Sequence, residues 1–182
     1  LFPICGSIRG DHAVTQSGKE LSMPRHGIVR KKEFTCVEQK EDTITFVIES
    51  NEEMMKQYPY PFRLEIQYTL DGKKIRTEYH IYNTGAETMP FQIGGHPGFN
   101  CPLLEGENYE DYKIEFAQNE ECDVPTPVTE TGLIDTANRT PFLKDQKDLS
   151  LGHELFAVDA VILDKLKSRS VKLVTEKHNK GI

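Results

Sequence analysis

Two runs of alternating residues, joined by a turn signal, most restrict what this chain can fold into. Between Phe62 and Leu70 apolar and polar residues alternate, a period of two that is typical of a β-strand with one buried face. Asp71-Gly72 follows and indicates a hairpin, because both central positions of a type I′ turn need positive φ. A return strand from Lys73 to Asn83 is then expected. The inward-facing residues of this strand should be Ile75, Tyr79 and Ile81.

Most of the remaining chain also favours strands. We predict them at 42–50, 89–93, 112–117, 157–163 and 170–176, with a short helix within 51–58 and a long surface excursion over 124–152. No internal repeat, linker or low-complexity tract divides the chain. The expected fold class is therefore all-β: a large antiparallel β-sandwich forming a single domain over residues 1–182.

Composition excludes several classes of partner. The 182 residues carry a net charge of −7 with an isoelectric point near 5.4, whereas nucleic-acid binding needs a basic stripe. The mean hydropathy is −0.54, and no apolar run reaches the length of a membrane span or a signal-peptide core. We therefore expect a soluble protein with neither a nucleic acid nor a membrane as partner.

The cysteines do not form a metal or disulfide framework. Cys5, Cys36, Cys101 and Cys122 are widely spaced, without a Cys-x-x-Cys pair. Reduced thiols in a cytoplasmic protein are the expectation. Phosphate-loop, dinucleotide and zinc motifs are missing, so no cofactor and no metal is expected, and the sequon at 138–140 is attributed to chance.

Two histidines beside glycines are the strongest candidates for chemistry. His96 lies in Gly94-Gly95-His96-Pro97, and His26 lies in Pro24-Arg25-His26-Gly27. Glycine and proline fix the backbone around an imidazole that exchanges protons near neutral pH. Either histidine alone could simply end a loop, but two such elements in one β-rich chain indicate a paired-imidazole site. His12, His153 and His178 lie in polar contexts and are expected to be exposed.

Four blocks follow one another along the chain: the opening Leu-Phe-Pro-Ile-Cys-Gly, the His26-Gly27 block, Gly-His-Pro-Gly-Phe-Asn at 95–100, and Phe-Ala-Val-Asp-Ala-Val-Ile-Leu at 156–163. In this order they resemble the galactose mutarotase (aldose 1-epimerase) family, and within it the LacX-like and hexose-6-phosphate-epimerase-like branches. The resemblance covers nearly the whole chain. It implies the β-supersandwich of the mutarotases, and a cofactor-independent isomerase that interconverts the anomers of a hexose or a hexose phosphate.

The resemblance also implies roles for individual residues. His96 matches the family histidine that protonates the ring oxygen, His26 matches the histidine that hydrogen-bonds the sugar, and Asp159 matches the aspartate that accepts from sugar hydroxyls. The family often has an arginine after the glycine of the first block, where this chain has Ser7. Arg9, two residues on and so on the same face of an extended strand, is expected to take its place. Arg30 offers a further donor, and Arg25 is expected at the surface.

The family base is a glutamate, which the resemblance places beyond Ile182, so the chain is expected to be an internal fragment lacking strands at both ends. Expressed alone, such a fragment should be inactive and poorly soluble, because it would expose strand edges. Two other functions stay open. One is a carbohydrate-binding protein without turnover on the same fold, since a fold does not establish activity, and the other is a purely structural β-sandwich.

Overall fold

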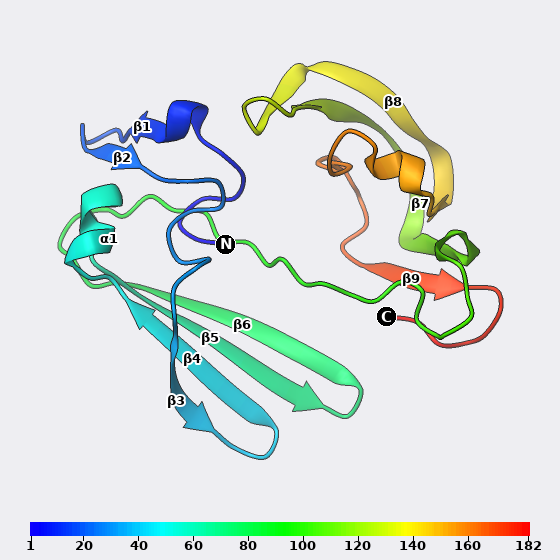
Figure 1. The fold of residues 1–182 in the computed structure, drawn as a ribbon, viewed down its shortest axis with the longest axis horizontal. Coiled ribbons are helices and arrows are strands. Elements are labelled where there is room, and N and C mark those ends of the chain that lie inside the picture. Colours follow the sequence, from blue (N-terminus) through cyan, green and yellow to red (C-terminus); the bar gives the residue numbers. More distant parts are fainter. The chain divides into compact units, whose positions relative to one another are not determined.

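The computed structural model describes residues 1–182, whose contacts divide the chain into two compact units, Leu1–His96 and Pro97–Ile182. Both units consist mainly of antiparallel strands, with one short α-helix and three 3-10 turns in the whole chain (Figure 1). The predicted all-β, antiparallel class is thus confirmed. A single domain over 1–182 stays a prediction. None of the helices combines the length and the apolar character that a membrane crossing requires.

The first unit contains two sheets. A small one pairs β1 (His12–Val14) with β2 (Glu20–Ser22), directly after a 3-10 turn at Arg9–Asp11. A four-stranded sheet has the order β3-β4-β5-β6. Its strands are β3 (Thr35–Gln39), β4 (Thr43–Glu49), β5 (Phe62–Asp71) and β6 (Lys74–Asn83). The predicted strands at 42–50, 62–70 and 73–83 correspond to β4, β5 and β6.

The hairpin between β5 and β6 differs from the prediction in detail. Asp71 pairs with Lys74, so the loop residues are Gly72 and Lys73, and of these only Gly72 has positive φ, at 58°. The turn therefore lies one residue later than predicted and is not of type I′. Ile75 was expected to be buried, yet it is 74% exposed at the tip of the hairpin. Alternation predicts which side a residue faces, and not whether anything covers that side.

The predicted helix is α1 (Glu52–Gln57). It begins where Asn51 accepts the backbone N–H of Met54 on its side-chain oxygen at 3.0 Å, which satisfies one of the donors that a first helical turn leaves open. Met54 of α1 is buried in the core of the first unit. The helix thus covers one side of that core.

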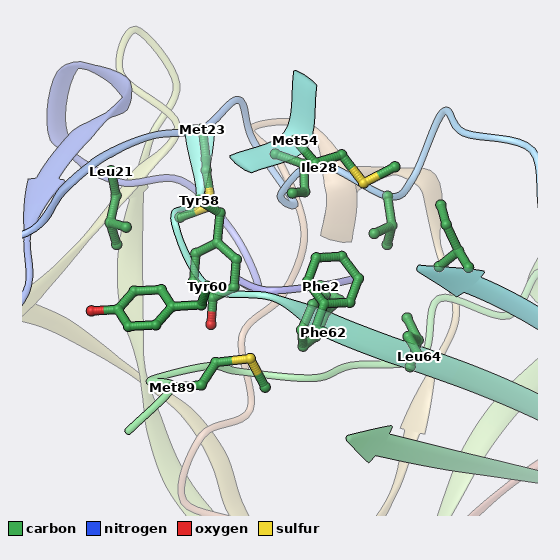
Figure 2. Packing of buried hydrophobic residues seen from close by; sticks show 12 residues of the cluster. Phe2, Leu21, Met23, Ile28, Met54, Tyr58, Tyr60, Phe62, Leu64 and Met89 are labelled. Carbon is green, nitrogen blue, oxygen red and sulfur yellow. The ribbon is translucent and has the colours of Figure 1, made fainter. Parts of the chain in front are cut away.

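Aromatic rings form the centre of this core (Figure 2). Phe2 is completely buried and packs edge-on against Phe62 of β5, with ring centroids 4.9 Å apart. The ring centroid of Tyr58 lies 6.1 Å from that of Phe2 and 6.2 Å from that of Phe62, and the Tyr58 hydroxyl donates its hydrogen to the carbonyl of Pro90. The opening residues of the chain are therefore an integral part of the first core.

The second unit contains one sheet with the order β8-β7-β9. Its strands are β7 (Tyr112–Val128), β8 (Leu133–Ser150) and β9 (Val171–Thr175), with 3-10 turns at Tyr109–Asp111 and His153–Phe156. β9 and the start of β7 correspond to predicted strands. The prediction of an excursion without strands over 124–152 is wrong, because the last five residues of β7 and all of β8 form most of a long hairpin there.

Prolines explain why the sequence did not predict this hairpin. Pro125 and Pro127 lie in β7 and Pro141 in β8, where several register shifts interrupt the ladder. Proline lacks a ladder donor and is tolerated at edges and bulges. β9 pairs only with Tyr112–Phe116, so the proline-containing half of β7 has β8 as its single partner.

Two predicted strands are not regular strands. Residues 89–93 are irregular, although Gln92 and Gly94 donate backbone N–H groups to Pro3 and Leu1. Residues 157–163 are also irregular. Their apolar residues serve tertiary packing instead, since Leu163 packs against the small core of the second unit around Phe116.

Candidate functional site

Three segments of the first unit come together around His26: the N-terminal stretch 1–6, the turn 24–28, and the stretch 92–96. The N-terminal stretch contacts both others. Leu1 exchanges backbone hydrogen bonds with Gly94 at 2.8 and 3.1 Å, while the carbonyl of Phe2 accepts the N–H of Ile28 at 3.1 Å. Both histidine-bearing segments are thus hydrogen-bonded to the N-terminal stretch, and the side chain of Phe2 anchors that stretch in the core.

Gly27 allows this close approach. It has φ of 80° and forms a parallel bridge with Phe2. A Cβ atom at this position would lie 2.2 Å from the carbonyl oxygen of Phe2. Glycine tolerates positive φ and leaves room for a neighbouring backbone. Gly27 therefore follows His26 for a steric reason, the room that Phe2 needs, in addition to the chemical role of the imidazole.

His26 is held by its own backbone and ring. It has φ of 72°, a conformation that costs free energy in a residue other than glycine and that clusters at functional sites. Its backbone N–H donates to the carbonyl of Gly6 at 2.7 Å, and its ring Nδ1 accepts the N–H of Gly6 at 3.1 Å. Because Nδ1 accepts, the neutral ring carries its proton on Nε2.

His96 lies beside His26. The two ring centroids are 6.0 Å apart, with the ring planes at 80°. His26 is half-buried whereas His96 is exposed. The pair therefore combines an oriented hydrogen-bond donor, Nε2–H of His26, with an accessible imidazole that can exchange protons with a bound molecule.

The electrostatic surroundings keep His26 neutral. Burial lowers its pKa below the ordinary 6.5, and the positive charges of Arg25 and Arg30 and the neighbouring His96 lower it further. As the pH falls below 6.5, the unfolded chain binds a proton that the folded site resists. His26 therefore makes the folded state less stable toward acid and contributes no such loss at neutral pH.

We expect Arg25→Gln to raise the pKa of His26 back toward 6.5, because it removes a positive charge that opposes the imidazolium. An NMR titration of the imidazole carbon-bound protons measures this directly. Arg76→Gln, at an exposed position of β6, is the matched control and should leave the titration unchanged. A lower pKa in Arg25→Gln, or an equal shift in the control, would contradict this electrostatic account.

Arg9 does not lie on a strand face with Ser7, contrary to the expectation. It begins the 3-10 turn Arg9–Asp11 and is exposed. The arginines whose charges reach His26 are Arg25 and Arg30. Arg25, expected only at the surface, is indeed exposed, and its charge still acts on His26. Its position next to His26 in the sequence could have indicated this effect.

Asp159 belongs to the second unit. It is half-buried, and its Oδ1 accepts the N–H of Ala160 at 2.7 Å, which restrains the carboxylate locally. Arg9, His26 and His96 all belong to the first unit. The grouping of Asp159 with them in one site stays a prediction.

The second unit contains a polar cluster that sequence reasoning missed. His178, expected to be exposed, has a side chain only 15% exposed, with Nε2 3.1 Å from Glu107. The Tyr112 hydroxyl donates to the same carboxylate. His178 Nδ1 accepts the N–H of Lys180, so the neutral ring donates from Nε2. No local pattern predicts a contact across 71 residues, and the cluster joins the C-terminal tail to the loop before β7.

No group of three potential metal-binding side chains was found, and the four cysteines are free thiols. The exposed thiol of Cys5 lies near Gly94, where an added Cβ would be 2.7 Å from its sulfur.

Known proteins resemble this chain over its whole length. Residues 1–182 match the family described as aldose 1-epimerase. The plasmid and chromosomal LacX proteins of Lactococcus lactis subsp. lactis are each 51% identical over 187 residues, which cover 100% of this chain and 62% of theirs. This chain thus spans less than two thirds of the length of these relatives.

Solved structures give the same result. A galactose mutarotase related enzyme from Lactobacillus acidophilus superimposes with a TM-score of 0.86 at 32% identity, covering 100% of this chain and 59% of that one. A galactose mutarotase-like protein from Lactobacillus casei gives a TM-score of 0.78 at 24% identity, covering 100% and 61%, a likeness of fold. The predicted mutarotase-like fold is confirmed, and the chain belongs to the aldose 1-epimerase family.

Proposed function

We propose that the protein interconverts the α and β anomers of a hexose or a hexose phosphate, with His96 as the general acid. The observation that carries the proposal is the His26–His96 pair, with ring centroids 6.0 Å apart, in a chain of the aldose 1-epimerase family. Isolated histidines at loop ends are common, whereas two imidazoles fixed side by side suit proton exchange with one bound molecule.

The reaction moves two protons and no net electrons. The imidazolium of His96 gives its proton to the ring oxygen while a base removes the proton of the anomeric hydroxyl, so the C1–ring-oxygen bond breaks and C1 becomes a carbonyl. Rotation about C1–C2 presents the other face, and the reverse transfers close the ring. We assign the base to the family glutamate, which the family pattern places outside residues 1–182. This scheme requires no cofactor.

His26 takes the part of a donor. Its neutral ring offers Nε2–H, since Nδ1 is occupied by the amide of Gly6, and burial and the nearby positive charges lower its pKa and so favour this neutral form. A neutral donor stabilises developing negative charge on a sugar oxygen without competing for the catalytic proton. We assign Asp159 to sugar hydroxyls and Arg9 to the sugar or its oxyanion.

Replacing His26 by alanine in the complete protein should weaken hexose binding by about tenfold, because an unpaired sugar hydroxyl in a partly dry site costs about 1–3 kcal/mol. Calorimetric titration with glucose, galactose and their 6-phosphates measures the loss and identifies the preferred sugar. His12→Ala, at an exposed position of β1, is the control. Unchanged affinity in His26→Ala would remove His26 from the site.

The same titration, together with polarimetry of anomer interconversion, separates the enzyme from its alternatives. A sugar that binds while its anomers interconvert no faster than in buffer indicates a carbohydrate-binding protein. Failure of every sugar to bind indicates a structural β-sandwich.

A reducing compartment such as the cytoplasm suits a protein whose four cysteines are free.

A further inference from the structure

The segment 159–168, which carries Asp159 at its start, has no regular secondary structure. A carboxylate that binds a sugar must be held to within a fraction of an ångström by its surroundings. No ladder of backbone hydrogen bonds supplies that restraint here. The Asp159 carboxylate accepts the N–H of Ala160, and side chains of β7 and β8 attach to the second half of the segment.

Arg139 of β8 makes the most extensive of these attachments. Its Nη1 and Nη2 donate to the two carboxylate oxygens of Asp164 at 3.0 and 2.6 Å. Its Nε donates to the carboxylate of Asp123 at 2.8 Å, and Nη2 also reaches the Asp123 carbonyl at 3.1 Å. Its side chain is only 14% exposed. One planar guanidinium thus joins the segment to β7 through a bidentate pair on one side and Asp123 on the other.

Further contacts fix the residues next to Asp164. Lys165 donates to Asp123 at 2.9 Å. The fully buried carboxylate of Glu120 on β7 accepts the backbone N–H groups of Lys167 and Ser168 at 2.9 and 2.6 Å, and Leu163 packs against the small core. The segment is therefore anchored from residue 163 onward.

We propose that Arg139 is a positioning residue for sugar binding, which fixes the segment 159–168 on the β7–β8 hairpin and thereby sets the place of the Asp159 carboxylate. This inference rests on the proposed function. Without Arg139, the carboxylates of Asp123 and Asp164 keep only Lys165 as a cation between them, and their mutual repulsion loosens the segment at Asp164, while the contacts of Leu163, Lys167 and Ser168 remain. Asp159 lies five residues before Asp164, so it moves with the segment.

The first test is the steady-state kinetics of Arg139→Gln in the complete protein. Misplacing a group that binds ground state and transition state alike raises KM and leaves kcat nearly unchanged, so we expect KM for the preferred hexose to rise about tenfold. Arg139→Lys keeps the charge without the planar fork and should recover part of the loss. Arg63→Gln is the matched control, because Arg63 of β5 likewise bridges two carboxylates, those of Glu49 and Glu65.

The second test is a double-mutant cycle with Asp159→Asn. If Arg139 acts through Asp159, Arg139→Gln should change KM by less than twofold in the Asp159→Asn background. Additive effects, an unchanged KM in Arg139→Gln, or an equal rise in Arg63→Gln would overturn the inference. Should Arg139→Gln fold poorly, Asp164→Asn replaces it in the same cycle with the same criteria.

The wild-type measurement distinguishes the two levels of the proposal. A wild-type protein that neither binds nor interconverts hexoses overturns the proposed function and this inference with it. A wild-type protein that interconverts anomers, combined with an additive cycle, overturns only the role of Arg139.

Discussion

Replacing His96 with alanine is expected to slow anomer interconversion by about 100-fold or more, because a general acid contributes about 10²–10⁴ to the rate. His96 is exposed, so the fold should survive. Polarimetry on freshly dissolved α-glucose or α-galactose, with the complete protein at neutral pH, measures the rate. kcat should fall more than the affinity for the sugar.

His80→Ala is the matched control for that measurement. His80 is also exposed, on β6 of the same unit, and the proposed mechanism gives it no part. Its variant should interconvert anomers at the wild-type rate. A wild-type rate in His96→Ala, or an equal loss in His80→Ala, would remove His96 from the role of acid.

Gly27→Ala should lower the free energy of unfolding by about 3–5 kcal/mol, the size expected when a backbone clash is added to strain at positive φ. The new Cβ would lie 2.2 Å from the Phe2 carbonyl oxygen. Relieving that clash means separating Phe2 from the turn that carries His26, and Phe2 is buried at the centre of the first core. Urea unfolding followed by circular dichroism gives the stability change.

Gly18→Ala separates the clash from the backbone strain. Gly18 has φ of 83°, close to the 80° of Gly27, yet nothing lies within 4 Å of an added Cβ. We expect Gly18→Ala to cost only about 1 kcal/mol. Equal costs at the two glycines would show that the approach of Phe2 to Gly27 contributes nothing.

Local patterns predicted the first unit better than the second. Alternation and a turn signal predicted β5 and β6, and the helix expected within 51–58 corresponds to α1, because these features depend on neighbours in sequence. The burial of Ile75 was predicted wrongly, since covering a strand face requires a distant segment. The long hairpin of β7 and β8 was missed because three prolines and several register shifts interrupt its pattern.

The candidate site shows the same division. The glycines beside His26 and His96 signalled special backbone positions, and the structure brings the two rings together. Arg9 was placed on a strand that is a turn in the structure. The attachments of Arg139 to Asp123 and Asp164 reach across 16 and 25 residues. Ion pairs of that kind have no signature in a single sequence.

The most direct test of the central claim is the exchange between α and β anomers, measured by NMR on the complete wild-type protein with glucose, galactose and their 6-phosphates at neutral pH. The account predicts that at least one of these sugars exchanges its anomers far faster than in buffer alone, with no added metal or cofactor. Exchange at the buffer rate for every sugar, under conditions where a sugar binds, would contradict it.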